Sequence, residues 1–240
     1  MAMNQMFQWM RQVSGKLGGP LDQTNPQHMS FYRQLQKDLK AEQPLTKSLN
    51  ELDITVLDLE TSGFYPDGGD KILSIGAVKI REGRVNKEET YYSPVCEPDA
   101  LSEEVASLTG LTKEELKGAP ELSDVLKEFY EFIQTDLLVA HHARHEKKFL
   151  QHASYQAIGV QFQHRLLDTS FLLRIAAPDL PVSNLDDCCG YYSIPIKHRH
   201  HALGDALVTA DLWAKTQQEV IKRGFETLQD IYAYLNSQNK

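Results

Sequence analysis

Residues 54–60, Ile-Thr-Val-Leu-Asp-Leu-Glu, constrain the fold of this chain more than any other segment. A short apolar run that contains β-branched residues is typical of a buried strand. Because side chains i and i+2 of a strand point to the same face, we expect Asp58 and Glu60 side by side at its end. Two carboxylates in apolar surroundings repel each other and lose hydration, so the pair predicts a cation between them. Hard divalent ions such as Mg²⁺ and Mn²⁺ prefer carboxylate oxygens, and ions held in this way commonly assist phosphoryl-group chemistry.

The remaining hydrophobic pattern predicts an α/β fold. Strands are expected over residues 54–59, 72–80 and 85–93, and the short turns between them indicate an antiparallel meander. Two shorter strands, 137–140 and 166–167, alternate with helices. The expected helices run from Ser102 to Gly110, from the capping-box-like Thr112, over 122–133, from the end of strand 137–140 to about Ile158, and over 169–176, 184–192 and 205–223.

The first 50 residues differ from the rest in pattern and charge. Two apolar stripes with helical spacing, Met3 to Leu17 and Phe31 to Leu39, predict two short helices and a linker. This segment carries six basic and three acidic residues, hence +3, and the remainder carries 19 basic and 30 acidic residues, hence −11. We therefore divide the chain into a helical N-terminal extension, 1–50, and a main domain, 51–240. The extension either packs on the main domain or contacts a nucleic acid or protein partner.

Overall composition limits the possible partners and location. A net charge of −8 argues against broad clamping of long duplexes, but bound metal ions can offset local charge where a phosphate binds. Three cysteines, Cys96 and the adjacent Cys188 and Cys189, make no disulfide framework and favour a reducing cytoplasm. No apolar run approaches the roughly 20 residues of a membrane-spanning helix, and the N-terminus does not resemble a signal peptide.

Two further segments can bring acids to the same edge of the sheet. Glu146 follows strand 137–140, and Asp205 lies in the run His-His-Ala-Leu-Gly-Asp-Ala that begins at His200. On one continuous helix, His200 and Asp205 would point about 140° apart. They can meet only if His200 lies in the preceding loop and Asp205 in the first turn, a transition that Gly204 permits. The histidines nearby also fit a zinc site by number, but the acids favour harder ions.

Three motifs, in this order, resemble those of the DEDDh 3′–5′ exonucleases, which include the proofreading epsilon subunit of DNA polymerase III, oligoribonuclease and ribonuclease T. The first family motif, Asp-x-Glu-Thr-(Thr/Ser)-Gly, matches residues 58–63, and the third, His-x-Ala-Leu-x-Asp-Ala, matches residues 200–206. The second, approximately His-Asn-Ala-x-Phe-Asp, aligns with residues 141–146, where His142, His145 and Glu146 replace Asn, Phe and Asp. The resemblance covers about residues 52–222.

This resemblance implies a ribonuclease H-like mixed sheet, the antiparallel meander plus parallel strands, flanked by helices. It also implies two divalent cations, Mg²⁺ or Mn²⁺, which Asp58 bridges, with Glu60 and Asp205 completing one site and Glu146 supporting the other. His200 would accept a proton from the attacking water. The residues expected to bind the substrate are Thr61, Phe64 and His141.

The expected activity is metal-dependent hydrolysis from the 3′ end of a nucleic acid, with release of nucleoside 5′-monophosphates. DNA in proofreading or repair is the favoured substrate, and single-stranded 3′ ends, a polymerase or a repair protein are the expected partners. One alternative is a 3′–5′ exoribonuclease. Another is a catalytically weakened nucleic-acid-binding module, for which the altered second motif would be the signature. No membrane partner is expected.

Overall fold

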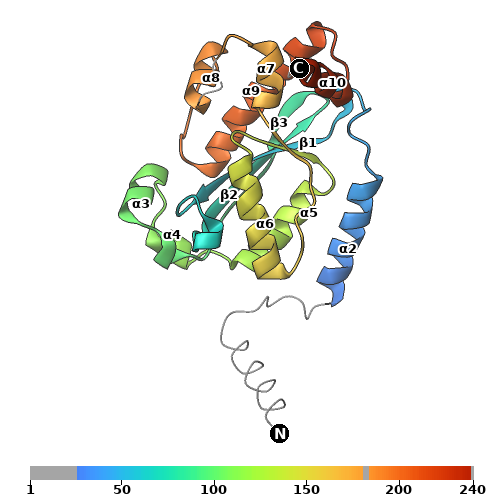
Figure 1. Ribbon diagram of the computed structural model, residues 1–240. Coiled ribbons are helices and arrows are strands. Elements are labelled where there is room, and N and C mark those ends of the chain that lie inside the picture. The colour runs from blue at the N-terminus through green and yellow to red at the C-terminus, as the bar shows by residue number, and fades with distance from the viewer. Residues whose placement is uncertain (1–25, 181–183, 239–240) are drawn as a thin grey trace.

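The computed structural model describes residues 26–180 and 184–238, and a five-stranded mixed sheet forms its centre (Figure 1). The strand order is β3-β2-β1-β4-β5. β2 pairs antiparallel with both β1 and β3, whereas β4 pairs parallel with both β1 and β5. The predicted meander is therefore present, with two parallel strands added at one edge. The strands are β1 (Ile54–Thr61), β2 (Ile72–Arg81), β3 (Arg84–Pro94), β4 (Leu137–Ala140) and β5 (Leu166–Asp168).

The helices follow the predicted order. The one over residues 3–17 lies outside the described residues. The C-terminal helix α10 was not predicted, although it buries Leu228 and Ile231. None of the helices in the described part of the chain is long and apolar enough to cross a membrane. The helices are α2 (Pro26–Ala41), α3 (Glu103–Thr109), α4 (Lys113–Lys117), α5 (Leu122–Ile133), α6 (Arg144–Ile158), α7 (Ser170–Ala176), α8 (Leu185–Tyr191), α9 (Ala202–Lys222) and α10 (Leu228–Gln238).

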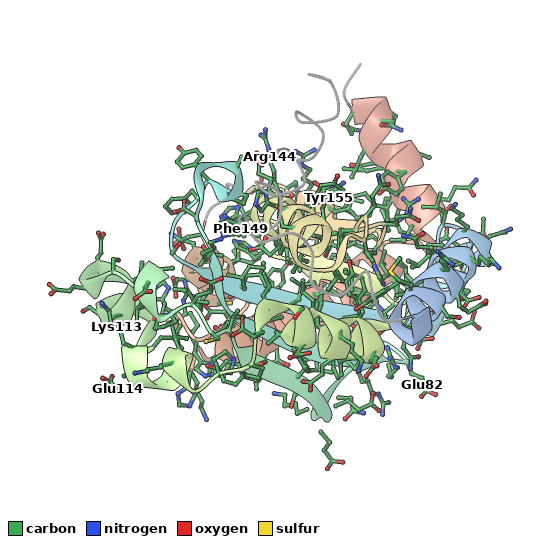
Figure 2. All side chains as sticks on the ribbon, turned by 90° about the horizontal axis from the view of Figure 1, so that it is seen from below. Glu82, Lys113, Glu114, Arg144, Phe149 and Tyr155 are labelled. Atoms are coloured by element: carbon green, nitrogen blue, oxygen red, sulfur yellow. The ribbon has the colours of Figure 1, made fainter. Side chains whose placement is uncertain are left out.

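The two faces of the sheet pack against different helices. Leu57 and Leu59 of β1 join a core with residues of α2, α5 and α6. On α6, Phe149 is buried in this core, whereas Arg144 and Tyr155 are exposed (Figure 2). Ile54 and Val56 join a second core with residues of α7, α9 and α10. Because alternate side chains of a strand share a face, the positions of Asp58 and Glu60 continue the face that α9 covers.

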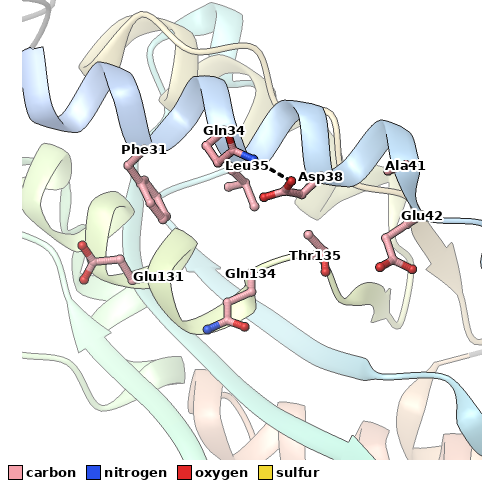
Figure 3. A pocket seen from close by; sticks show the side chains of 9 residues that line it. All are labelled: Phe31, Gln34, Leu35, Asp38, Ala41, Glu42, Glu131, Gln134 and Thr135. Atoms are coloured by element: carbon pink, nitrogen blue, oxygen red, sulfur yellow. Dashed lines mark hydrogen bonds between the residues drawn. The ribbon is translucent and has the colours of Figure 1, made fainter.

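Helix α2 packs on the main domain and borders a groove. Its Tyr32 and Leu35 are buried in the same core as β1 and α5. Between α2 and the end of α5 lies a cavity of about 650 Å³, whose lining includes Asp38, Glu42 and Glu131 and no basic residue (Figure 3). An acidic lining repels a phosphodiester, so this groove does not suit the nucleic-acid contact that was one alternative for the N-terminal extension.

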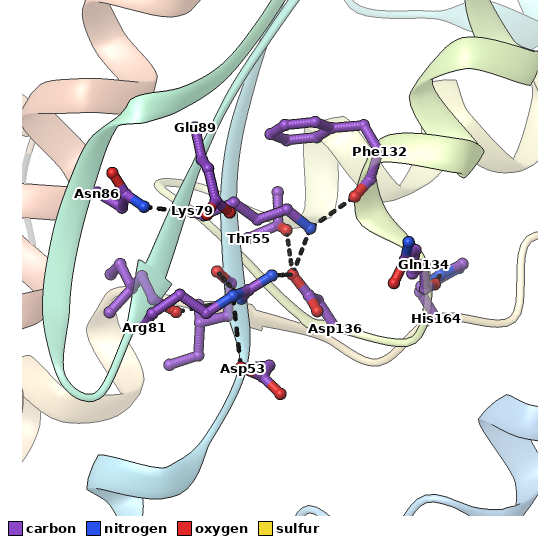
Figure 4. Close-up of polar contacts among 12 residues, drawn as sticks. Asp53, Thr55, Lys79, Arg81, Asn86, Glu89, Phe132, Gln134, Asp136 and His164 are labelled. Carbon is purple, nitrogen blue, oxygen red and sulfur yellow. Dashed lines mark hydrogen bonds and ion pairs between the residues drawn. The ribbon is translucent and has the colours of Figure 1, made fainter.

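A buried carboxylate at the start of β4 shows how the fold neutralises an acid without a metal. Asp136 Oδ2 accepts hydrogen bonds from Thr55 Oγ1 at 2.6 Å, Lys79 Nζ at 2.6 Å and Arg81 Nη2 at 3.0 Å (Figure 4). Two cations and a hydroxyl thus converge on one oxygen at the end of β1 opposite to Asp58 and Glu60. Buried charges are stable when they are paired in this way.

A glycine allows α9 to approach the sheet beside the predicted acids. Gly76 of β2 is the register partner of Asp58. A Cβ atom on Gly76 would lie 2.1 Å from the backbone nitrogen of Leu203 and 2.2 Å from the carbonyl carbon of Ala202. The first turn of α9 therefore rests directly on the backbone of β2, which brings the N-terminal end of that helix to Asp58.

We expect Gly76→Ala to destabilise the fold and to separate the two elements that carry the acids. Overpacking of a closely packed core costs about 1–3 kcal/mol, and here the obstructing atoms are backbone. Thermal unfolding and Mn²⁺ titration measure the two effects. Gly190→Ala in α8 is the matched control because a Cβ there meets nothing within 4 Å. A Gly76→Ala variant as stable as the control would contradict the proposed close approach.

Candidate metal-dependent active site

Three carboxylates converge between β1 and α9. Asp58, Glu60 and Asp205 each offer an oxygen within 4.8 Å of the others. The first two belong to β1, as the strand period predicted, and Asp205 lies in the first turn of α9. Oxygens on opposite sides of one Mg²⁺ ion are about 4.2 Å apart, so the three carboxylates lie close enough to share a divalent ion after small side-chain adjustments.

Glu146 approaches the same place from the other side of β1. It lies in the first turn of α6, just after β4, and is only 4% exposed. One of its oxygens, Oε2, is buried and has no hydrogen-bond partner within residues 26–180 and 184–238. The group whose oxygens lie within 4.8 Å does not include Glu146, so the structure brings this residue to the edge of the cluster rather than into its centre.

His200 and Asp205 adopt the arrangement that the sequence requires. His200 lies in the loop before α9, with a left-handed φ of 57°, and its backbone N–H donates to Asp205 Oδ2 at 3.1 Å. The helix begins at Ala202, three residues earlier than predicted. His201 explains the difference, because it is the N-cap and its Nδ1 accepts a bond from the Gly204 N–H at 3.4 Å.

The residues predicted to bind the substrate differ in their exposure to solvent. Phe64 is 73% exposed, and its ring meets that of His145 edge-on at 5.8 Å. Thr61 Oγ1 donates to the Gly63 carbonyl at 2.7 Å and lies 3.2 Å from His145 Nε2. His141 is buried, with Nδ1 2.7 Å from Thr169 Oγ1.

One cavity of about 480 Å³ unites most of these residues. It includes every predicted site residue except Thr61, which reaches it through His145. Sequence reasoning did not identify Asn184, Leu185 and Arg199 as part of its lining. The only sequence signal for Arg199 was its place beside His200. The residues that line the cavity are Asp58, Leu59, Glu60, Phe64, His141, His142, His145, Glu146, Asn184, Leu185, Arg199, His200 and Asp205.

The electrostatics of the cavity favour a bound cation. Burial, followed by repulsion from Glu146, Glu60 and Asp205, raises the pKa of Asp58 well above its ordinary value. Burial and repulsion from Asp205 raise the pKa of Glu60 to about 7, and burial raises that of Glu146 to about 8. At neutral pH these groups would ionise readily only with additional positive charge beside them.

The residues present fit divalent metal ions. Two buried oxygens, Glu146 Oε2 and Asp205 Oδ1, have no hydrogen-bond partner among the described residues. Buried carboxylate oxygens of this kind are costly unless a proton, a donor or a cation reaches them. Asp136 is paired with two basic side chains, whereas Arg199 is the basic residue that lines this cavity. The oxygens of Asp58, Glu60 and Asp205 are ligands that hard divalent ions accept.

Comparison with known families agrees with this chemistry. The exonuclease family RNase_T matches residues 55–213. The chain belongs to this exonuclease family. The matched residues include β1, α6 and the first turn of α9, which carry the four acids. The resemblance to DEDDh exonucleases inferred from the three motifs is thereby confirmed.

The relatives of this exonuclease domain are much longer proteins. It is 31% identical over 186 residues to "DNA polymerase III PolC-type" of Caldanaerobacter subterraneus. The matched region covers 77% of this chain and 13% of that protein. It is 33% identical over 190 residues to a "DNA polymerase III subunit epsilon-like protein" of Rhodobacter capsulatus, covering 78% of this chain and 26% of that protein. The chain thus corresponds to a small part of these relatives.

Solved structures confirm the ribonuclease H-like fold. The nuclease domain of 3'hExo, a DEDDh family member bound to rAMP, superposes with a TM-score of 0.62 at 19% identity, over 72% of this chain and 95% of that one. Exonuclease X in complex with 5' overhanging duplex DNA gives a TM-score of 0.55 at 19% identity, over 74% and 98%.

We expect the metal-free exonuclease domain to lose stability as pH rises. In the Glu146→Gln variant this loss of stability should be smaller. The pKa of Glu146 is about 8 in the folded state and ordinarily 4.5, so its stabilising contribution is complete below pH 4.5 and is lost as pH rises through 8. The variant should therefore gain stability relative to wild type as pH rises from about 4.5 to 8, and the difference should level off at higher pH. Unfolding of both proteins at several pH values with EDTA measures this difference. The titration of groups that do not interact with Glu146, such as His164, affects both proteins equally and cancels from the comparison. A pH-independent difference would contradict the assignment.

Proposed function

We propose that this chain is a metal-dependent 3′–5′ exonuclease that releases nucleoside 5′-monophosphates from nucleic acid ends. The observation that carries the proposal is the convergence of Asp58, Glu60 and Asp205 within 4.8 Å, in a cavity that also holds Glu146 and His200. Membership of the exonuclease family supports the same reaction.

Each acid has a proposed role. Asp58, Glu60 and Asp205 would hold one divalent ion, and Asp58 with Glu146 would hold a second, with Mg²⁺ or Mn²⁺ as the ions. Two such ions stabilise both the attacking and the leaving oxygens of a phosphoryl transfer. Because the acids lie on β1 and in the first turns of α6 and α9, these elements would set where the ions, and through them the scissile phosphate, sit.

His200 is the proposed general base. Its backbone N–H donates to Asp205 Oδ2, and His200 is one of the residues that line the cavity. A histidine in that position can take a proton from the attacking water. Its exposed edge leaves a route by which the proton then reaches solvent, since the side chain is only partly buried.

The proposed substrate is the single-stranded 3′ end of DNA. Phe64 is exposed beside the acids and can stack on the terminal base, a contact worth about 1–3 kcal/mol in single-strand binders. We propose that Thr61 and His141 help to place the terminal nucleotide. Relatives named as DNA polymerase III components share about 30% identity, which favours DNA, a polymerase or repair partner and a cytoplasmic location.

RNA is the second candidate substrate. The neighbour 3'hExo is bound to rAMP, and a further neighbour is a 3'-exonuclease with 3'-end specific recognition of a histone mRNA stem-loop. Both share less than 20% identity with this chain, so they carry less weight than the polymerase relatives. A binding module without activity remains the third reading, because Glu146 departs from the family motif.

Digestion of labelled strands tests these alternatives. DNA and RNA single strands, each labelled at the 5′ or the 3′ end, are incubated with Mn²⁺ or Mg²⁺. Stepwise shortening from the 3′ end, lost in an Asp58 variant, is the expected result, with DNA cut faster than RNA. The absence of metal-dependent cleavage of either polymer by the folded protein would favour the binding module.

We expect Glu146→Asp to preserve or raise activity. The aspartate restores the acid of the family motif and shortens the side chain by one methylene, while the charge is kept. Glu146→Gln, which removes the charge, serves as the control and should lower the rate. Steady-state rates on a labelled oligonucleotide compare the three proteins. A folded but inactive Asp variant would show that this cavity requires the longer side chain.

A further inference from the structure

We infer that Arg199 is a positioning residue, which holds one oxygen of Asp205 so that the other oxygen is presented to the divalent ions. The inference rests on the proposed function and assigns a role to a residue outside the three motifs. It concerns how one metal-binding carboxylate is fixed in place.

Arg199 links α8 to α9 through two carboxylates. Its Nε and Nη2 donate to Asp186 Oδ1 and Oδ2, at 2.9 and 3.1 Å. The same guanidinium donates through Nη1 to Asp205 Oδ2. Two parallel bonds between a guanidinium and a carboxylate fix orientation as well as distance. Asp186 therefore sets the plane of the guanidinium, and that plane directs Nη1 toward Asp205.

The two oxygens of Asp205 have different surroundings. Oδ2 accepts from Arg199 and from the backbone N–H of His200. Oδ1 is buried and has no hydrogen-bond partner in the part of the chain that the structure describes. A carboxylate held by two donors on one oxygen cannot rotate freely, so its second oxygen keeps one direction. Because Asp205 belongs to the group of three carboxylates whose oxygens lie within 4.8 Å, we infer that Oδ1 is its oxygen that faces a cation shared with Asp58 and Glu60.

The loop that carries Arg199 is itself rigidly placed. His198 and His200, on either side of it, have left-handed φ values of 55° and 57°. Non-glycine residues adopt this conformation uncommonly, and surrounding contacts help to maintain it. A Cβ on Gly204 would lie 2.3 Å from the carbonyl oxygen of His198, so the loop packs directly against the first turn of α9.

Arg199 could instead compete with metal ions for Asp205, and the two roles predict opposite effects on metal binding. A guanidinium near the acids is a positive charge that repels incoming dications and can compete with them for Asp205. If competition dominates, removal of Arg199 tightens metal binding. If positioning dominates, removal weakens it. Two observations favour positioning. The bidentate bond to Asp186 holds the guanidinium on α8. Asp205 Oδ1 has no hydrogen-bond partner among the described residues, so it stays available to a cation.

Mn²⁺ titration by calorimetry of the full chain tests the inference, with Arg199→Gln, Arg199→Lys and Asp186→Asn. Loss of residues that orient metal ligands typically weakens metal affinity by about 10–100-fold, and we expect that increase in Kd for Arg199→Gln. Arg199→Lys should lose most of the same affinity, since one ammonium cannot reproduce a planar fork. Asp186→Asn combined with Arg199→Gln should be no weaker than Arg199→Gln alone.

Controls separate positioning from charge and from misfolding. Arg165→Gln removes the same charge at an exposed position and should bind Mn²⁺ like wild type. Circular dichroism without metal confirms that each variant is folded. Unchanged or tighter Mn²⁺ binding by folded Arg199→Gln, or wild-type binding by Arg199→Lys, would overturn the inference alone. Failure of folded wild-type protein to bind Mn²⁺ would overturn the proposed function and the inference with it.

Discussion

Asp58→Asn is expected to abolish exonuclease activity while making the metal-free protein more stable. The variant loses the carboxylate proposed to bridge two ions, whose stabilisation of the transition state is worth several kcal/mol, so the rate should fall by at least about 10³-fold. Stability should rise at pH 8, because burial and repulsion from Glu146, Glu60 and Asp205 raise the pKa of Asp58 and make its charge costly in the absence of metal.

Three measurements on one protein check this result: oligonucleotide cleavage, the unfolding temperature in EDTA, and the shift of that temperature on addition of Mn²⁺. Wild type should gain stability with Mn²⁺, since a ligand that binds only the folded state stabilises it, and the variant should gain little. Asp53→Asn is the matched control, because this exposed acid lies just before the opposite end of the same strand and pairs with the partly exposed Arg81. An active Asp58→Asn variant would refute the metal assignment.

His200→Asn is expected to lower the rate by about 10²–10⁴-fold, the usual contribution of acid–base catalysis, while Mn²⁺ affinity stays close to that of wild type. Affinity is preserved because the backbone N–H of His200, and not its imidazole, bonds to Asp205. Asparagine is chosen because it tolerates the left-handed φ of 57° at this position.

His142→Asn is the matched control for this prediction. His142 lines the same cavity, has a similar φ of 60°, and stands where the family motif has asparagine. Its replacement should change the rate little. Equal loss of activity in both variants would show that the cavity needs its histidines in general. An unchanged rate in His200→Asn would exclude His200 as the base.

The contrast between the two ends of β1 supports the proposal that the acids at one end form the functional site. At the start of the strand, Asp136 is neutralised by Lys79 and Arg81. At its far end, Asp58 and Glu60 meet Asp205, and two buried oxygens nearby have no hydrogen-bond partner among the residues that the structure describes. Natural proteins retain such costly arrangements where function requires them. The unbalanced charge is therefore what a divalent ion is expected to correct.

Features that depend on neighbouring residues were predictable from sequence. The period of two in a strand placed Asp58 and Glu60 on one face, and the helical period of 3.6 required His200 to precede the helix that carries Asp205. Strand and turn patterns predicted the antiparallel meander. Helix boundaries were less certain, since α9 begins at Ala202 through a histidine cap that no simple pattern indicates. Helix α10 was missed although it buries Leu228 and Ile231.

The sequence by itself determined the strand that carries two acids and the position of His200 before the helix of Asp205, because these follow from local periodicity. The three motifs were predictable because they resemble those of a known family. Only the tertiary structure decided that Gly76 lets α9 touch the sheet, that Glu146 lies buried at the edge of the cluster, and that Arg199 joins Asp186 to Asp205. Each of these depends on the close approach of separate elements. Packing of the whole chain fixes such contacts, and spacing along the sequence does not encode them.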